Sequence, residues 1–230
     1  GALSVYASLY VPQPILPLLS ADFGTTPAQA SLALSVATIS MGMSQVLVGP
    51  VADSLGRKPI MTLAVLAAGV IGLIASRMTS FNSYLLVRFL HGLVMAGLPA
   101  TAMAYLAEEI DTRHLGAAMG LYISGNSLGG LGGRIISGTV AEFWGWRGST
   151  VVIGLVSLVC ALWFARTLPP SKHFRAQPLQ LRRLARSLLG AFLDPLLRSL
   201  YFVGFLTMGS FVALYNYVSY HLMAPPYNLS

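Results

Sequence analysis

Long stretches without charged residues alternate with short polar turns along this chain. Seven apolar segments can be marked, at residues 1–20, 28–50, 59–76, 82–107, 115–141, 148–165 and 199–221. Each has close to the ~20 residues with which an α-helix crosses the hydrocarbon core of a bilayer. Backbone N–H and C=O groups must pair within the segment there, so each segment predicts a helix. We therefore expect an all-α membrane protein.

Composition narrows the class of protein further. Of the 230 residues, 55% are hydrophobic and 9% are charged, and the mean hydropathy is +0.71. A soluble domain carries about 25% charged residues, so this chain cannot cover itself with polar surface in water. The sequence has no nucleophile–base set, metal-ligand cluster or nucleotide fingerprint, which argues against an enzyme and against a cofactor. The single cysteine, Cys160, lies in an apolar segment and reads as a small buried hydrophobe.

Basic residues are divided unevenly between the two sets of turns. One set holds ten of them: Arg57, Lys58, Arg113 and the seven from Arg166 to Arg198. The other set holds Arg77 and Arg147. Cytoplasmic loops carry the excess of Lys and Arg, so we expect the ten-base set inside. The net charge of +7 follows this asymmetry and does not form a stripe for nucleic acid.

The longest polar connection, residues 166–198, divides the chain. Its apolar residues recur near helical spacing, opposite the arginines: Leu181, Leu184, Leu188 and Phe192. This pattern predicts either an amphipathic helix on the inner leaflet or a solvated basic linker. We expect an N-terminal six-helix transport bundle at 1–165, this linker, and the first helix of a truncated C-terminal bundle at 199–230. The chain starts inside an apolar segment without an initiator Met, so we expect a fragment of a longer protein.

The sequence repeats itself at an offset of 89 residues. The segment GPVADSLGRK at 49–58 matches GTVAEFWGWR at 138–147, and both copies end the second helix of a three-helix set. Three is an odd number of crossings, so the second set enters the membrane inverted. The pattern predicts the inverted-topology repeat of secondary transporters, with the two turns on opposite sides of the membrane.

The first copy of the repeat also carries a motif. Its residues Gly49, Asp53, Gly56, Arg57 and Lys58 match the pattern G-x-x-x-D-x-x-G-R-K. In this the chain resembles the major facilitator superfamily, which has that pattern between its helices 2 and 3. The resemblance implies a twelve-helix transporter of which this chain holds helices 1 to 7. The family often has a base where this chain has Ser54.

Asp53 lies where the helix at 28–50 is expected to end. An acid at a helix C-terminus is disfavoured by about 0.3–1 kcal/mol, so Asp53 needs a positive partner. Arg57 can supply it, and so can a helix N-terminus from the other half of the transporter. We expect this contact to hold the cytoplasmic face shut.

The segment GNSLGGLGG at 125–133 resembles the Gly-rich motif in helix 5 of the family's drug/proton antiporters. Its surroundings are similar to bacterial arabinose-efflux-like permeases, although Gly130 replaces the usual Pro and Arg134 replaces a common Gly. A phosphate-binding glycine loop would need a preceding strand, which an apolar helix does not provide. Gly125, Gly129 and Gly133 recur every four residues, which predicts close helix packing.

Two arginines, Arg88 and Arg134, lie within predicted helices. An Arg at the bilayer centre costs about 2.5–3.5 kcal/mol on insertion scales. Each lies roughly six to eight residues, or about 9–12 Å, from the outer end of its helix. Each can therefore snorkel to the headgroups or face a pore near Asp22. The segment RFLHG resembles an Arg-containing family motif, which implies an inward-facing Arg88, and we expect it in the pore.

Other pore candidates come from the family, in which helices 1 and 4 of each half line the path. These candidates are aromatic or polar: Tyr6, Tyr10, Gln13, Arg88, His91, Met95, Tyr215, Asn216 and Tyr220. Aromatic side chains with a few hydrogen-bonding groups suit a small, mostly apolar solute. No Asp or Glu lies mid-membrane in this sequence. His91 and Asp22 are therefore the candidates for carrying a coupling proton.

These inferences favour a secondary transporter that exports a small solute in exchange for protons, as a monomer in a bacterial inner membrane. The expected partners are that solute, the proton and the lipid bilayer. A proton-coupled uptake permease on the same fold stays open, and a mid-membrane carboxylate would favour it. A non-transporting scaffold or sensor is disfavoured, because it has no need of repeated gating turns.

Overall fold

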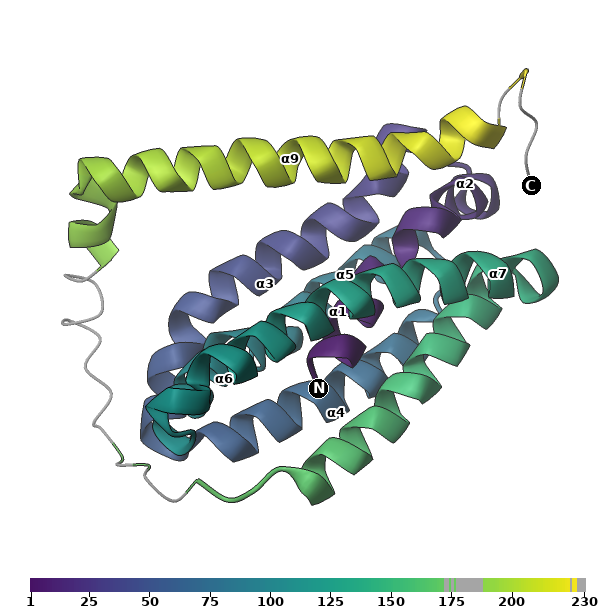
Figure 1. Ribbon diagram of the computed structural model, residues 1–230. Helices are drawn as coiled ribbons and strands as arrows, with labels where there is room; N and C mark the ends of the chain where they lie inside the picture. The colour runs from purple at the N-terminus through teal and green to yellow at the C-terminus, as the bar shows by residue number, and fades with distance from the viewer. Residues whose placement is uncertain (172–173, 175, 177–187, 224, 227–230) are drawn as a thin grey trace. The chain divides into compact units, whose positions relative to one another are not determined.

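The computed structural model describes residues 1–171, 174, 176, 188–223 and 225–226. They divide into two compact units, residues 1–177 and 178–230, which are considered separately. Figure 1 labels the helices: α1 Ala2–Tyr10, α2 Pro12–Phe23, α3 Pro27–Leu55, α4 Arg57–Ala75, α5 Phe81–Met95, α6 Pro99–Glu109, α7 Thr112–Thr167 and α9 Pro195–Met223. Stretches long and apolar enough to cross a membrane cover all seven predicted segments, which confirms the all-α membrane protein.

Proline divides two of these crossings into shorter helices. Helices α1 and α2 form one stretch, Ala2–Phe23, that is interrupted at Val11 just before Pro12. Pro12 has no N–H, so the carbonyl of Ser8 loses its usual helical donor. Helices α5 and α6 are likewise separated by a three-residue turn, residues 96–98, and α6 begins at Pro99. Interrupted helices are tolerated in membranes where other groups satisfy the freed carbonyls.

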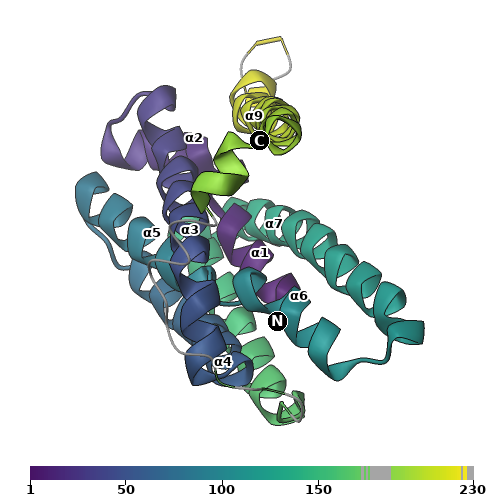
Figure 2. The same cartoon turned by 90° about the vertical axis from the view of Figure 1, so that its left-hand side faces the viewer.

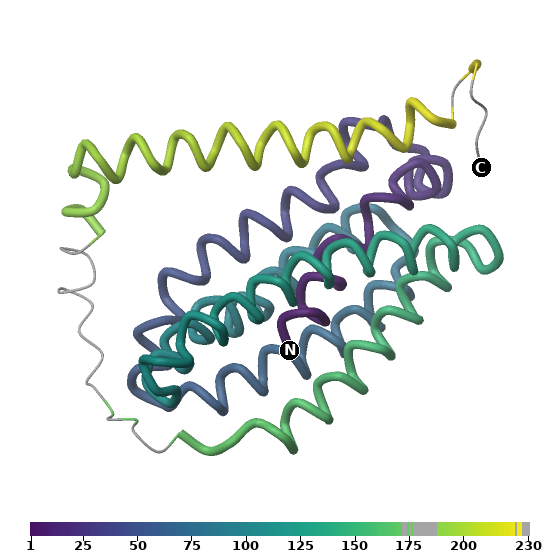
Figure 3. The backbone as a smooth tube through the Cα atoms, in the orientation of Figure 1, coloured from purple at the N-terminus to yellow at the C-terminus, as the bar shows by residue number. Residues whose placement is uncertain are grey.

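Helix α7 contains two crossings. A straight helix of 56 residues would be about 84 Å long, far more than the ~30 Å of a hydrocarbon core. Gly145 breaks it with non-helical φ 63° and ψ −176°. The chain reverses direction within α7, as the tube in Figure 3 shows. The predicted segments 115–141 and 148–165 thus lie on the two arms of α7.

The turns that connect the helices of the first unit lie in two groups, one at each end of the bundle, as expected for a chain that crosses a membrane back and forth. At one end, Lys58 Nζ donates to the Leu168 carbonyl at 2.5 Å, and Tyr105 Oη donates to the Pro169 carbonyl at 2.9 Å. The α3–α4 turn, the end of α6 and the end of α7 therefore meet. At the other end, Arg147 donates to the Met78 carbonyl at 3.3 Å, which joins the α7 turn to the α4–α5 connection.

Small residues let α1 and α7 approach closely, and Figure 2 shows the two helices side by side. A Cβ at Gly133 would lie 2.6 Å from the Ala7 carbonyl oxygen, and one at Gly129 would overlap the Leu3 carbonyl. A Cβ at Gly125 would lie 3.4 Å from the Ala2 Cβ. The every-fourth-residue glycines therefore face α1, and backbone rather than side chain fills the interface.

The second unit is described through α9 and a short helical stretch at 188–193. Asp194 caps α9, since its Oδ1 accepts from the backbone N–H of Leu196 at 2.8 Å and of Leu197 at 3.1 Å. Most of the segment predicted to be an amphipathic helix or linker lies outside the described residues. The domain boundaries at 165 and 198 stay predictions.

Candidate functional site

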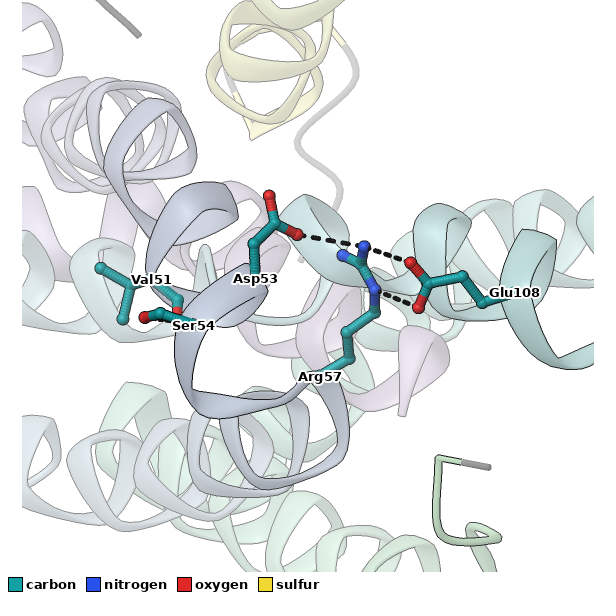
Figure 4. A network of polar contacts seen from close by, with 5 residues as sticks. All are labelled: Val51, Asp53, Ser54, Arg57 and Glu108. Carbon is teal, nitrogen blue, oxygen red and sulfur yellow. Dashed lines mark hydrogen bonds and ion pairs between the residues drawn. The ribbon is translucent and has the colours of Figure 1, made fainter. Parts of the chain in front are cut away.

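The turn between α3 and α4, residues 53–58, is called the Gly56 turn. Gly56 has φ 103°, a backbone conformation that residues with a Cβ rarely adopt. Helix α4 starts at the next residue. This geometry directs Arg57 back toward the last turn of α3. Its Nη2 lies 3.0 Å from Asp53 Oδ1, so the positive partner expected for Asp53 is Arg57 (Figure 4).

A second acid completes this network. Glu108, in the last turn of α6, accepts from Arg57 Nε at 2.7 Å and from Nη2 at 2.6 Å (Figure 4). Two parallel N–H···O bonds make this a bidentate, charge-assisted pair. The Arg57 residue is 9% exposed. The pair ties the Gly56 turn to α6, a contact that sequence reasoning missed.

Other motif residues have separate surroundings. Ser54 Oγ donates to the Val51 carbonyl at 2.8 Å and so bonds its own helix (Figure 4). Lys58 reaches the end of α7, as described above. A Cβ at Gly49 would meet nothing within 4 Å, so packing within the described chain does not require a glycine there.

The turn within α7, residues 142–147, is called the Gly145 turn, and it holds a similar acid–base contact at the other end of the bundle. At the offset of 89 residues its base, Arg147, aligns with Lys58 rather than with Arg57. Gly145 is offset from Gly56 by 89 residues and also has positive φ, at 63°. Asp22 Oδ2 accepts from Arg147 Nη1 at 2.8 Å and from the Trp146 indole N–H at 3.1 Å. A basic turn thus binds an acid at a helix end in both places. Asp22 pairs with Arg147, and its expected place in a pore near Arg88 stays a prediction.

Arg88 lies inside the bundle and is 2% exposed, so it does not snorkel to the surface. It donates to the backbone carbonyls of Ser8 at 3.3 Å, Leu9 at 2.8 Å and Ala33 at 3.0 Å. The Ser8 carbonyl is the one that Pro12 leaves without a helical donor. Arg88 therefore joins the interrupted first crossing to α3.

His91 lies beside Arg88 and is also 2% exposed. Because a guanidinium can only donate, His91 Nδ1 accepts from Arg88 Nη1 at 3.1 Å. Met95, one turn further along α5, is fully buried at 0%. Whether Arg88, His91 and Met95 reach a solute path during transport stays a prediction.

The expected path residues of the first crossing meet α7. Arg134 Nε donates to Gln13 Oε1 at 2.6 Å, and its guanidinium carbon lies 4.0 Å from the centre of the Tyr10 ring. Tyr6 lies one turn before Tyr10 and is half-buried. The remaining candidates belong to α9 of the second unit, where their part in a path stays a prediction: Tyr215, Asn216 and Tyr220.

Residues 1–230 match the model of the Major Facilitator Superfamily over their whole length. The chain belongs to that superfamily. It is 44% identical over 227 residues to the uncharacterized MFS-type transporter YybF of Bacillus subtilis, covering 99% of this chain and 56% of that protein. It is 44% identical over 230 residues to the inner membrane transport protein YnfM of Escherichia coli, covering 100% of this chain and 55% of that protein. It is 34% identical over 161 residues to the 4-hydroxybenzoate transporter PcaK of Pseudomonas putida, covering 70% of this chain and 36% of that protein.

These comparisons establish a multi-pass membrane protein of a transporter family, not of an enzyme family. The chain spans about half the length of YybF and YnfM, with 56% and 55% of those proteins covered. The motif at the Gly56 turn, from which the resemblance was inferred, is thus part of a match that includes every described helix.

Proposed function

We propose that this chain is the N-terminal part of a secondary transporter that exports a small, mostly apolar solute by alternating access, in exchange for protons. The observation that carries the proposal is the pair of similar networks at opposite ends of one bundle. Each joins a base in a positive-φ glycine turn to an acid at the end of another helix. Alternating access needs a closable contact on each side, and inverted repeats supply a similar contact twice.

The Gly56 network has the properties of a contact that can break and reform. Arg57 has little exposed side-chain surface, at 11%, whereas those of Asp53 and Glu108 are 40% and 32% exposed. Water can therefore solvate the acids when the pair separates, which limits the cost of opening. Asp53 and Glu108 come from helices α3 and α6, so their shared bond to Arg57 couples the positions of these helices.

The acids of the first unit lie near the ends of its helices, at Asp22, Asp53, Glu108, Glu109, Asp111 and Glu142. None is placed to carry a proton across the membrane centre. We propose that the coupling carboxylate belongs to the second half of the full-length transporter, with His91 as the candidate in this half. The direction of transport and the coupling rest on the resemblance to drug/proton antiporters.

Everted membrane vesicles containing the full-length transporter test this proposal. After respiration acidifies the vesicle interior, addition of a transported solute should release protons and raise the internal pH, read with a fluorescent pH indicator. A panel of naphthalene derivatives, anionic, neutral and cationic, supplies the solutes. Proton movement in the same direction as the solute would indicate an uptake permease instead. No response above transporter-free vesicles with any member of the panel would contradict the proposed function.

A further inference from the structure

A row of side chains on the first arm of α7 is not explained by the glycine packing against α1. It consists of Tyr122, Asn126, Gly130 and Arg134, called the polar row below. Its members are four residues apart, so they share one face of the helix. A face with a phenol, an amide and a guanidinium is costly in a membrane unless it has polar partners.

The opposite side of the polar row is aromatic and comes from the first crossing. Tyr10 stacks under the Arg134 guanidinium, and Gln13 accepts its Nε–H. A Cβ at Gly130 would lie 3.1 Å from Arg134 Nη1 and 3.2 Å from Tyr10 Cδ2. The absence of a side chain at residue 130 therefore leaves room for the guanidinium to lie along α7. Tyr6 lies one helical turn before Tyr10 on the same crossing and near Tyr122, and so extends the aromatic face.

Two oxygens in the polar row are buried and lie one helical turn apart, the Tyr122 hydroxyl and the Asn126 carboxamide oxygen. The two side chains lie within reach of each other, but neither oxygen has a hydrogen bond of good geometry to any described residue. A buried oxygen without a well-formed hydrogen bond loses water and gains little in return. A phenol can donate and a carboxamide oxygen can accept, so the pair suits a polar group on a bound solute.

The two charged residues within the predicted crossings, Arg88 and Arg134, are both basic. Between Asp111 and Glu142 the sequence has no acid, and Arg134 is the only charged residue there besides Arg113. Arg88, the other intramembrane base, donates to backbone carbonyls and a histidine inside the bundle. Arg134 is held by an amide and a ring, and a planar guanidinium is the group best shaped for a carboxylate. A charged residue in a membrane helix commonly marks the path of a charged solute.

We propose that the polar row binds the anionic group of the transported solute. The solute is then an organic anion with an apolar, ring-sized body: Arg134 binds its carboxylate, Tyr122 and Asn126 hydrogen-bond its polar atoms, and Tyr6 and Tyr10 contact its body. This assignment rests on the proposed function and names its substrate class. The competing explanation is that Arg134 only clamps the first crossing to α7.

Binding to the full-length transporter in lipid nanodiscs separates these explanations. Calorimetric titrations use three probes of one shape: naphthalene-2-carboxylate, naphthalene-2-carboxamide and 2-(aminomethyl)naphthalene. The wild type should bind the carboxylate about tenfold more tightly than either other probe, as one charge-assisted bond provides. Arg134→Gln should lose that preference, whereas Arg134→Lys, which keeps the charge, should retain part of it. Asn126→Leu should weaken carboxylate binding, and Arg77→Gln, which removes an exposed base outside the row, should change nothing.

The following results would overturn the assignment of the polar row as an anion site. If the wild type does not bind the carboxylate, or binds the amide or amine equally well, the substrate is not an anion recognised here. If Arg134→Gln and Arg134→Lys lose binding alike, with the same loss of melting temperature, Arg134 is a structural clamp. Proton release in the vesicle assay is a separate readout: if it persists with neutral or cationic probes, transport stands and only the anion assignment fails.

Discussion

At the scale of single residues, two arginines of the first unit, Arg57 and Arg88, bond different kinds of partner. Arg57 bonds two partly exposed carboxylates, Asp53 and Glu108, which belong to two different helices. Arg88 bonds backbone carbonyls in the buried core, and one of them is the Ser8 carbonyl freed by Pro12. A proline-interrupted crossing and a buried arginine thus form one structural unit, in which each needs the other.

Removing Arg88 tests that dependence. Arg88→Leu should lower the apparent melting temperature of the transporter, because the buried Ser8 carbonyl would lose its donor at a cost of about 1–3 kcal/mol, and the Leu9 and Ala33 carbonyls would each lose a second donor. Arg88→Lys should recover part of the loss, and Arg77→Gln is the control for loss of an exposed base. Fluorescence-detected gel filtration after heating gives the melting temperature. A variant as stable as wild type would mean that water or lipid replaces the arginine without loss.

At the scale of helices, adjacent glycines of α7 have opposite surroundings. A Cβ at Gly133 would lie 2.6 Å from the Ala7 carbonyl oxygen, whereas one at Gly132 would meet nothing within 4 Å. Close backbone approach is what small residues contribute to helix packing in a membrane. The two positions therefore form a matched pair.

Valine at these two positions should give different results. Gly133→Val should push α1 away from α7 and cost about 1–3 kcal/mol, as overpacking usually does. Gly132→Val should leave the melting temperature within the scatter of the wild type, measured in the same heating assay. Equal effects of the two substitutions would show that glycine content, not the α1 contact, matters here.

Much of this arrangement was predictable from local sequence. Seven apolar segments predicted the crossings, and the offset of 89 residues predicted that Gly56 and Gly145 end corresponding helices. The Asp53–Arg57 pair followed from a spacing of four across a turn. Glu108, Tyr122 and Asn126 were missed, because their contacts depend on how helices rotate about their axes. Arg57 and Glu108 are 51 residues apart in sequence, and no local pattern aligns their faces.

At the scale of the whole molecule, the distribution of basic residues predicts which turns lie on which side of the membrane. The Gly56 turn lies at the end of the first unit with most of its basic residues, and the Gly145 turn lies at the other end. We predict that a cysteine at Ser54 is labelled only from the cytoplasm and one at Asn82 only from outside. Labelling of intact cells and of everted vesicles with an impermeant maleimide measures this. Labelling of position 54 in intact cells would reverse the assignment.

The central claim is that the two networks close opposite faces of one transporter. Ser44 lies on α3, two to three turns before Asp53, in the half of the helix that leads to the Gly56 turn. The most direct measurement is the labelling rate of a cysteine at Ser44 from the cytoplasmic side, in everted vesicles with the full-length transporter. We predict a faster rate in Asp53→Asn and in Glu108→Gln, and a slower rate in Asp22→Asn, which frees Arg147 and favours the outward-open state. Equal rates in all three variants and the wild type would contradict the claim and leave both networks as structural contacts with no part in closing either face.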